Sequence, residues 1–586
     1  MFDRKGPSEF LRLGVTIGVC MVVPFPRAMA SAPLPTSTLL LVEANGADVT
    51  RVPRKTAVQL VAQVQSPTAA LTTGRVRFCD ASLSVCNDLH QLGVAQLTSS
   101  GAATLTIVPG IGVRSYRAEF LGIAKEYQSS LSSAQTLTVT GKFPTTTTLA
   151  ATGNPGDYTL NATVVGSGST ASLSGTVTFT DLGANNESLG SSAIGSSTPG
   201  LSLAVASGST NLPAPSALGD FNGDGIPDLA GAESTDSIAI LLGDGAGGFL
   251  ATRTSIPVGY NVGQFAVGDF NGDGFQDIAA VSYTDAKLVI VLGKGDGTFQ
   301  SPMVLPGALY ANTIVVGDFN RDGIADLATT NNGVSAVTLY IGRGDGTFNK
   351  KSTPLAGASV NMALADFNGD GIEDIAAIEA SSVEVLLGNA NGTFTSASNT
   401  AVGADPFQVI AGDFNNDGVP DLATVSPTEY SVSILLGQGS GAFTASPDIA
   451  FDSSTQPYAI ALTDLNQDEI EDIAVATASS VEGQAYASVL FGTGQGTFVS
   501  TDLPIPGRIF EGASEYFILS ADMNGDGNPD LILGPGVLLD KVTETAQASL
   551  SGVSISGSGT HSVQAASALS SPYNSSTSGT LGLQAQ

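Results

Sequence analysis

Short runs in which apolar residues alternate with polar or small residues recur along almost the whole chain. Between residues 201 and 540 they follow one order: an alternating run such as QFAVGDF, an acidic loop, a short run such as DIAAV, and a third run such as KLVIVLG. Alternation with a period of two is typical of half-buried strands. Helix signals are weak, since Gly, Ser, Thr and Val dominate. The patterning therefore predicts an all-β protein.

The acidic loop is the most regular part of this order. It reads GDFNGDGIPDLA in its first copy and occurs seven times, at spacings of 47 to 58 residues. The third run usually ends in a glycine turn followed by Phe, as in GKGDGTF, after which a fourth strand can lead to the next loop. Four short strands in each period predict the blades of a β-propeller over residues 201–540.

These repeats resemble the bacterial FG-GAP/VCBS repeats, whose blades are similar to those of the integrin α-subunit propeller. The resemblance rests on the seven ordered loops and covers more than half of the chain. It implies a seven-bladed β-propeller that binds calcium and serves in non-covalent recognition or adhesion.

Each acidic loop carries oxygen atoms at a fixed spacing. Ca²⁺ prefers about six to eight oxygen ligands, and side-chain oxygens at positions 1, 3, 5 and 9 with a carbonyl oxygen at position 7 can wrap it. Gly225 at position 6 permits the positive φ that turns the loop back toward the ion. The expected ligands, copy by copy, are Asp220, Asn222, Asp224, Ile226, Asp228; Asp269, Asn271, Asp273, Phe275, Asp277; Asp318, Asn320, Asp322, Ile324, Asp326; Asp366, Asn368, Asp370, Ile372, Asp374; Asp413, Asn415, Asp417, Val419, Asp421; Asp464, Asn466, Asp468, Ile470, Asp472; and Asp522, Asn524, Asp526, Asn528, Asp530.

The sequence therefore predicts about seven Ca²⁺ sites of unequal strength. Glu469 occupies position 6 of the copy at Asp464, where a side chain is disfavoured, so this site is expected to be the weakest. Arg321 places a cation at position 4 of the third copy and is expected to lower its affinity. Solvated turns without metal are the alternative, although ordinary turns do not require an acid at position 9.

The charge of the chain is concentrated in the repeats. The chain has 22 basic and 53 acidic residues, and residues 202–540 hold 41 of the acids but only 8 of the bases, a net charge of −33. A field of this sign repels nucleic acid and anionic lipid and attracts cations. Nucleic acid is therefore not an expected partner.

Strand patterns also flank the repeats. Residues 36–141, with runs such as AVQLVAQV and GRVRFCD, resemble a bacterial Ig-like domain of the Big_3 type. A second pattern over residues 142–200 stops half-finished, and residues 541–586 align with the second half of the first module. We therefore expect the propeller to be inserted into a second Ig-like β-sandwich built from these two segments. A disordered Ser/Gly-rich tail is the alternative.

The first thirty residues have the features of a secretory signal peptide: basic residues, an apolar run too short to span a bilayer, and small residues before Ser31. No later stretch predicts membrane insertion, so a secreted or cell-surface protein is expected. Export also favours a disulfide between Cys79 and Cys86, with a two-cysteine metal site as the weaker alternative.

These features predict a monomeric binding protein for an extracellular protein or glycan ligand. The lone His90 and His561 lie far apart, no nucleophile motif is present, and the paired carboxylates all fall in the acidic loops, so we expect no enzymatic activity. An extracellular carbohydrate-active enzyme or its accessory module is one alternative. A structural envelope or matrix protein without a discrete ligand is the other.

Overall fold

The computed structural model describes residues 32–81, 91–206, 212–213, 216–234, 236–282, 284–306, 311–331, 335–355, 359–453, 455–479, 485–503, 517–533, 536–570 and 572–586. Strands make up nearly all of its regular structure, and one short 3₁₀ turn, η1 (Leu182–Ala184), is the single helical element in this part of the chain. The expectation of an all-β fold is confirmed. None of the described elements is a helix with the length and hydropathy needed to span a membrane.

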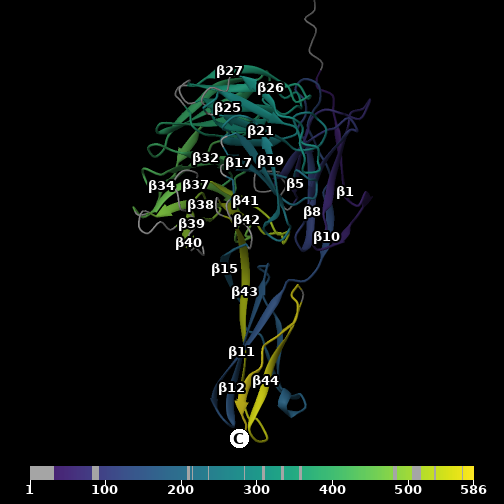
Figure 1. Cartoon of the computed structure of the whole chain (residues 1–586), viewed down its shortest axis with the longest axis vertical. Helices are drawn as coiled ribbons and strands as arrows, with labels where there is room; N and C mark the ends of the chain where they lie inside the picture. The colour runs from purple at the N-terminus through teal and green to yellow at the C-terminus, as the bar shows by residue number, and fades with distance from the viewer. Residues whose placement is uncertain are drawn as a thin grey trace, which may run out of the picture.

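The repeats form a broad body of successive antiparallel sheets, which we call the repeat body (residues 216–540; Figure 1). Six sheets have strands in sequence order. They are β16 (Ser216–Gly219), β17 (Asp228–Ser234), β18 (Ser237–Gly243), β19 (Phe249–Pro257); β20 (Gln264–Gly268), β21 (Asp277–Ser282), β22 (Lys287–Val291), β23 (Met303–Pro306); β24 (Ala311–Gly317), β25 (Asp326–Asn331), β26 (Ala336–Gly342), β27 (Phe348–Pro354); β28 (Met362–Ala365), β29 (Asp374–Glu379), β30 (Ser382–Asn389), β31 (Thr393–Ala401); β32 (Gln408–Gly412), β33 (Asp421–Ser426), β34 (Ser431–Gly437), β35 (Phe443–Ala445), β36 (Ile449–Ala450); and β37 (Thr455–Thr463), β38 (Asp472–Ser479), β39 (Ala485–Gly492), β40 (Phe498–Leu503).

The seventh repeat shares its sheet with another part of the molecule. Its strands β41 (Ile518–Ala521) and β42 (Asp530–Leu533) pair in order with the first residues of the long strand β43 (Gly536–Val553). On its other edge β43 pairs with β15 (Thr198–Val205), which precedes the first repeat. The last sheet of the repeat body therefore contains chain from both ends of the repeats.

Side chains rather than backbone ladders join one sheet to the next. Seven buried apolar clusters each draw residues from two neighbouring sheets, and one of them unites Leu229 of the first repeat with Met523 and Val537 of the seventh. Between neighbouring sheets, five edge-on aromatic pairs join the Phe at loop position 2 of one repeat to the Phe of the glycine turn of the next repeat, as in Phe414 and Phe498, 5.6 Å apart. Such pairs favour this tilted geometry.

A first sandwich precedes the repeats. One of its sheets has the order β2-β1-β4-β7 and the other the order β3-β10-β8-β5-β6, with β9 beside β8. Its strands are β1 (Ser37–Ala44), β2 (Ala47–Asp48), β3 (Arg51–Pro53), β4 (Val58–Gln65), β5 (Arg75–Asp80), β6 (Gln91–Gln96), β7 (Ala102–Ile107), β8 (Gly112–Phe120), β9 (Ser130–Leu131) and β10 (Gln135–Thr140). The two sheets enclose one apolar core, which includes Leu60, Phe78 and Phe120.

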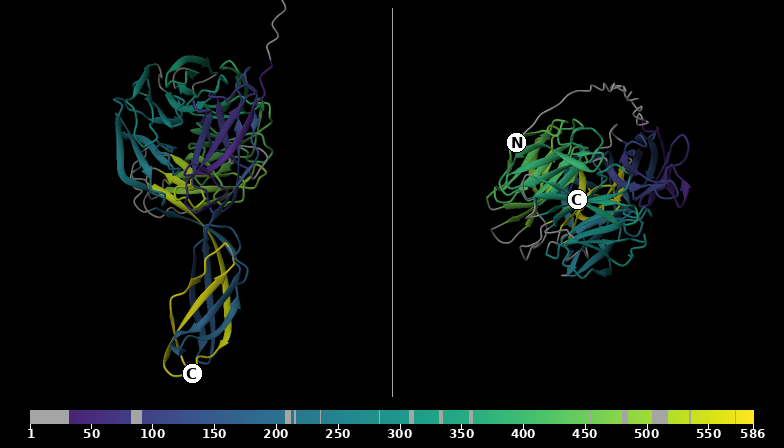
Figure 2. Two further views of the ribbon diagram at one scale, coloured as in Figure 1. Left: turned by 90° about the vertical axis from the view of Figure 1, so that its right-hand side faces the viewer. Right: turned by 90° about the horizontal axis from the view of Figure 1, so that it is seen from above.

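A second sandwich forms the narrow stalk below the repeat body (Figures 1 and 2). In one sheet, β12 lies between β11 and β43, and in the other β13 lies between β14 and β44. Segments from both sides of the repeats share its core, as Phe179 and Tyr573 show. The strands are β11 (Thr145–Asn154), β12 (Asp157–Ser167), β13 (Gly175–Asp181), β14 (Glu187–Ala193), β44 (Thr560–Leu569), β45 (Ser576–Thr577) and β46 (Leu581–Gln584).

Strand direction fixes which end of the repeat body each domain occupies. The first strand of every repeat runs into its acidic loop, so all seven loops lie at one end, here called the loop end. β43 runs parallel to these first strands and leaves the repeat body at the loop end before it enters the second sandwich. The first sandwich touches the same end, where Lys55 Nζ donates to the Gly245 carbonyl at 3.2 Å.

Candidate functional site

The structure brings the predicted residues of each loop together within one compact turn. In the first copy, one carboxylate oxygen of Asp220 accepts the backbone N–H groups of Gly223 and Asp224 at 2.8 and 3.1 Å, and the other accepts that of Gly225 at 3.0 Å. Asn222 donates from Nδ2 to Asp224 at 2.9 Å. The carboxylates at positions 1 and 5 therefore organise the loop through hydrogen bonds to their own backbone and to the position 3 amide.

The aspartate at position 9 accepts two backbone hydrogen bonds that the sequence pattern did not predict. In the first copy, Asp228 Oδ2 accepts the N–H of Phe221 at position 2, and Oδ1 accepts the N–H of Gly243 at the end of the third strand, both at 2.8 Å. The same two bonds recur in all seven copies, at 2.8–3.1 Å and 2.6–2.9 Å. Position 9 therefore ties the loop to two strands of its own repeat.

Burial makes the carboxyl groups at position 9 weaker acids than exposed aspartates. All seven have no exposed surface. Desolvation raises the pKa of Asp228, Asp374, Asp421 and Asp472 to about 7, and that of Asp277, Asp326 and Asp530 to about 8, against the lowering effect of the two backbone hydrogen bonds. Neighbouring loop aspartates raise these pKa values further.

Two positions of the loop, not one, need a left-handed backbone. Position 6 has positive φ in every copy, including Glu469 at φ 63°, which agrees with the strain expected there. Position 4 also has positive φ throughout, and Arg321 adopts 54° at this place. Position 6 could be recognised from the sequence because six copies have Gly there, whereas position 4 is occupied by Gly, Arg, Asn or Gln.

Arg321 contacts the first sandwich. Its guanidinium donates to the Leu121 carbonyl at 3.0 Å, and its own carbonyl accepts the N–H of Ala124 at 2.7 Å. Nearby, Arg75 of the first sandwich forms an ion pair at 3.2 Å with Glu373, whose other oxygen accepts the N–H of Asp318 at 2.6 Å. The third and fourth loops therefore form part of the surface on which the first sandwich rests.

Glu373 also shows how neighbouring loops are joined. It stands at position 8 of the fourth loop and bonds to position 1 of the third. Gln276, at position 8 of the second loop, likewise accepts the N–H of Asp220 in the first loop at 2.6 Å. Position 8 therefore links each of these loops to the preceding one, a role that the repeat pattern alone did not indicate.

The loops offer oxygen atoms only, the donor chemistry that suits Ca²⁺. Their carboxylates are already hydrogen-bonded within the loop, and across the described residues no cluster of three or more His, Cys, Asp or Glu side chains has the arrangement of a metal site. The seventh copy differs in detail, because Asn524 Nδ2 also donates to the position 9 aspartate, Asp530, at 3.2 Å. The loops have a suitable donor set, and the ion itself stays a prediction.

The remaining candidate residues lie away from the loops. Cys79 is buried at the end of β5, whereas Cys86 and His90 fall outside the described residues, as does the expected signal peptide, so the disulfide stays a prediction. His561 pairs through Nδ1 with Asp181 Oδ2 at 2.6 Å and joins β44 to the end of β13. His561 therefore has a structural contact within the second sandwich.

Replacing Glu469 by Gly should raise the free energy of unfolding by about 0.5–1 kcal/mol, because Gly removes the cost of a side chain in the left-handed region while adding some unfolded-state entropy. Chemical denaturation of the mature protein measures this change. Glu469→Gln, which removes the charge but keeps the Cβ, should have little effect. The reciprocal Gly418→Gln, at a position where a Cβ meets no atom within 4 Å, should destabilise the protein. Equal effects of Glu469→Gly and Glu469→Gln would refute the backbone explanation.

The metal-free protein should lose stability as the pH rises from about 4 to about 8. A carboxyl group whose pKa is raised on folding binds its proton more tightly in the folded state, so its stabilising contribution is complete below the unfolded pKa and disappears above the folded one. Melting temperatures in chelator across this range measure the effect.

Repulsion between the many acidic residues also lowers the stability as the pH rises. A matched pair of variants separates this general repulsion from the effect of the buried carboxyl groups. Asp421→Asn, which removes one buried titrating group, should reduce the pH dependence more than Asp448→Asn, which removes an exposed carboxylate. Identical slopes for the two variants would contradict the assignment.

Comparison with known proteins identifies the repeats. The model of the FG-GAP-like repeat matches over residues 220–280, 269–329, 318–377, 366–424, 413–475 and 464–533, together more than half of the chain. No curated protein matches.

Several solved structures are similar to this chain at low identity. The periplasmic gluconolactonase PpgL of Pseudomonas aeruginosa is 13% identical with a TM-score of 0.38, and the alignment covers 57% of this chain and 96% of that one. The Dos1 propeller is 11% identical with a TM-score of 0.35, over 69% and 95%. The dihydro-heme d1 dehydrogenase NirN is 13% identical with a TM-score of 0.32, over 56% and 73%.

Two of these structures correct one expectation. The gluconolactonase and the dehydrogenase are enzymes by name, so the expectation that this chain is not an enzyme was wrong as a conclusion from its architecture. Likeness at this level assigns no reaction to this chain. The repeats, by contrast, are matched in sequence, and the chain belongs to the FG-GAP-like repeat family, with a repeat body of the β-propeller type.

Proposed function

We propose that the protein is a secreted or cell-surface recognition module in which a seven-bladed, calcium-stabilised propeller presents a binding face to an extracellular protein or glycan. The observation that carries this proposal is the difference between the two ends of the repeat body. All seven acidic loops and both sandwiches meet at the loop end, which leaves the opposite end for a ligand.

Seven blades in a closed ring are supported by the apolar clusters. Each repeat packs against the next, and the cluster that contains Leu229, Met523 and Val537 links the last repeat to the first. β15 adds a strand from before the first repeat to the last sheet, which is one way to hold a ring shut. A closed ring also removes exposed sheet faces that a row of separate sheets would leave in water.

We also propose Ig-like character for the sandwiches and insertion of the propeller into the second one. Residues 142–200 and 541–586 share two sheets and one core, and β43 belongs to both the last repeat and this sandwich. A continuous strand across the junction resists bending, since its ladder bonds on both sides would have to break. The stalk then holds the propeller away from its point of attachment.

Calcium has a defined place in this proposal. The oxygens at positions 1, 3, 5 and 9 and the carbonyl at position 7 would hold the ion. Burial, and to a smaller extent repulsion by a neighbouring loop carboxylate, raises the pKa of Asp464 and of Asp522 to about 6, and the ion would compensate that repulsion. An ion bound to the folded state alone also stabilises that state by mass action.

Calorimetric titration of the chelator-treated mature protein should detect about six or seven Ca²⁺ ions. Each site should add about 2.7 kcal/mol of stability when free Ca²⁺ is a hundredfold above its Kd. Asp370→Asn, at position 5 of the fourth loop, should lose one ion, whereas Asp448→Asn should lose none. Calcium should also weaken the fall of stability with pH, because the cation favours ionised carboxylates. No uptake and no shift in melting temperature would refute the metal assignment.

The recognition role is tested by a surface-binding screen of the calcium-loaded protein against arrayed glycans and extracellular matrix proteins. Saturable binding that disappears on unfolding, without turnover of the ligand, supports it. A complete lack of binding to both arrays would overturn it.

A further inference from the structure

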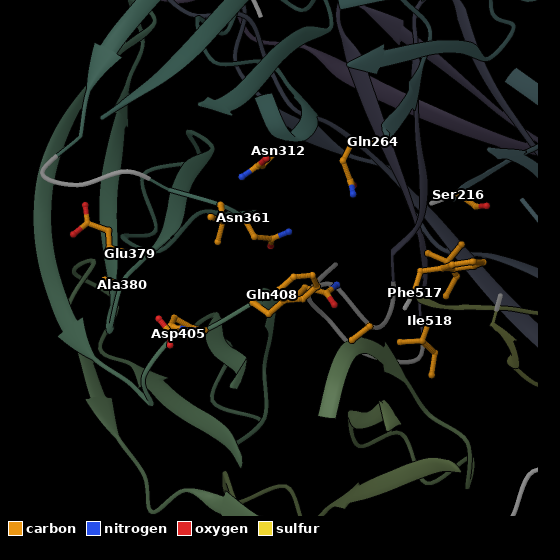
Figure 3. Close-up of a pocket in the computed structure, with 15 residues that line it drawn as sticks. Ser216, Gln264, Asn312, Asn361, Glu379, Ala380, Asp405, Gln408, Phe517 and Ile518 are labelled. Carbon is orange, nitrogen blue, oxygen red and sulfur yellow. The ribbon is translucent and has the colours of Figure 1, made fainter. Parts of the chain in front are cut away.

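The end of the repeat body opposite the acidic loops contains a cavity of about 630 Å³ (Figure 3). It is lined by residues at or next to the starts of the first strands of the repeats, among them Gln264, Asn361 and Gln408. Each of these three stands five residues before the first aspartate of its own loop. The same sequence position of the second, fourth and fifth repeats therefore faces one central opening, which the third repeat lines with Asn312, six residues before its loop.

The cavity has two chemically different sides. Four amide side chains come from four consecutive repeats, those of Gln264, Asn312, Asn361 and Gln408. The sixth and seventh repeats contribute apolar residues instead, which are Ala459, Phe517, Ile518 and Leu519. In Figure 3 the amides of Gln264, Asn312 and Asn361 turn toward the opening, with Phe517 and Ile518 across from them.

The amides also differ in the hydrogen bonds that they make within the protein. Asn361 accepts the N–H of Val409 at 3.2 Å and donates to Thr313 Oγ1 at 3.1 Å, and Gln408 Oε1 accepts the N–H of Ile460 at 2.9 Å. These bonds connect neighbouring repeats. Gln264 and Asn312 make no side-chain hydrogen bond to any part of the chain that the structure describes, so their donors and acceptors remain available to a ligand.

The charge of the lining limits the ligand. Glu379 and Asp405 are its charged residues, and the described lining includes no Lys, Arg or His. An anion would therefore meet carboxylates with no compensating cation. Phe407, 53% exposed, adds an aromatic ring to the lining. Amide groups opposite apolar and aromatic surface match a pyranose, whose hydroxyls lie along its edge and whose C–H groups form an apolar face.

We infer that this cavity binds a neutral oligosaccharide, with Gln264 and Asn312 as ligand-contacting residues. The inference rests on the proposed recognition function and assigns it a face and a ligand class. It does not depend on the acidic loops, because the cavity lies at the other end of the repeats.

The test is calorimetric titration of the calcium-loaded mature protein with neutral oligosaccharides: gluco-, xylo-, manno- and galacto-oligosaccharides of five or six units. Wild type should bind at least one, and the double variant Gln264→Ala/Asn312→Ala should bind it about tenfold more weakly, the loss of two modest hydrogen bonds. Gln300→Ala removes an exposed amide that lies beyond the glycine turn of the same repeat as Gln264, and it should bind like wild type. Unchanged melting temperatures verify the folding of all variants.

Three results would overturn the inference. If wild type binds an oligosaccharide and the double variant binds it equally well, the site is elsewhere while the recognition function stands. If none of the oligosaccharides binds but a matrix protein or an oligolysine peptide does, the ligand class is wrong and the recognition function again stands. If neither the oligosaccharides nor any arrayed glycan or protein binds, both proposals fail.

Discussion

The two hydrogen bonds accepted by the aspartate at position 9 are the constraint on which the repeat body depends. Asp228 and its six equivalents are fully buried, and each joins the start of its loop to the third strand of its repeat. A buried carboxylate without partners would be expensive, whereas two backbone N–H donors stabilise it and satisfy amide groups that the ladders leave unpaired. The loop and the strands of a repeat are therefore held together by one side chain.

This arrangement has an electrostatic consequence at the loop end. Every repeat adds carboxylates to the same end of the body, and their burial raises the pKa of groups such as Asp277 and Asp326 to about 8. The first sandwich meets this charge with Arg75, which pairs with Glu373, and with Lys55, which donates to a backbone carbonyl. Basic residues of the first sandwich therefore contact the acidic loop end where the sandwich packs on it.

Much of the architecture could be predicted because it is repeated. Seven loops of nearly constant spacing indicated the strand order, the family and the all-β class. The contacts that involve only one repeat could not be found in this way. The effect of Arg321 on calcium affinity stays a prediction, but nothing in the repeat pattern indicated the hydrogen bond that Arg321 donates to Leu121 of the first sandwich. The left-handed backbone at position 4 was missed because Arg, Asn and Gln occupy it in three copies, and its conformation follows from the loop's hydrogen bonds.

The central cavity was missed for a different physical reason. Its amides lie about fifty residues apart in the sequence and meet only because the repeats pack side by side. Among these amides, Asn361 and Gln408 have a structural role, because each bonds to the next repeat. The equivalent position of the sixth repeat is Ala459, which has no side-chain amide. An amide at this position is therefore not a requirement of the propeller. Gln264 and Asn312 project polar groups into the cavity without any bond to the described chain, and a ligand at the opening gives these two side chains a role that folding does not.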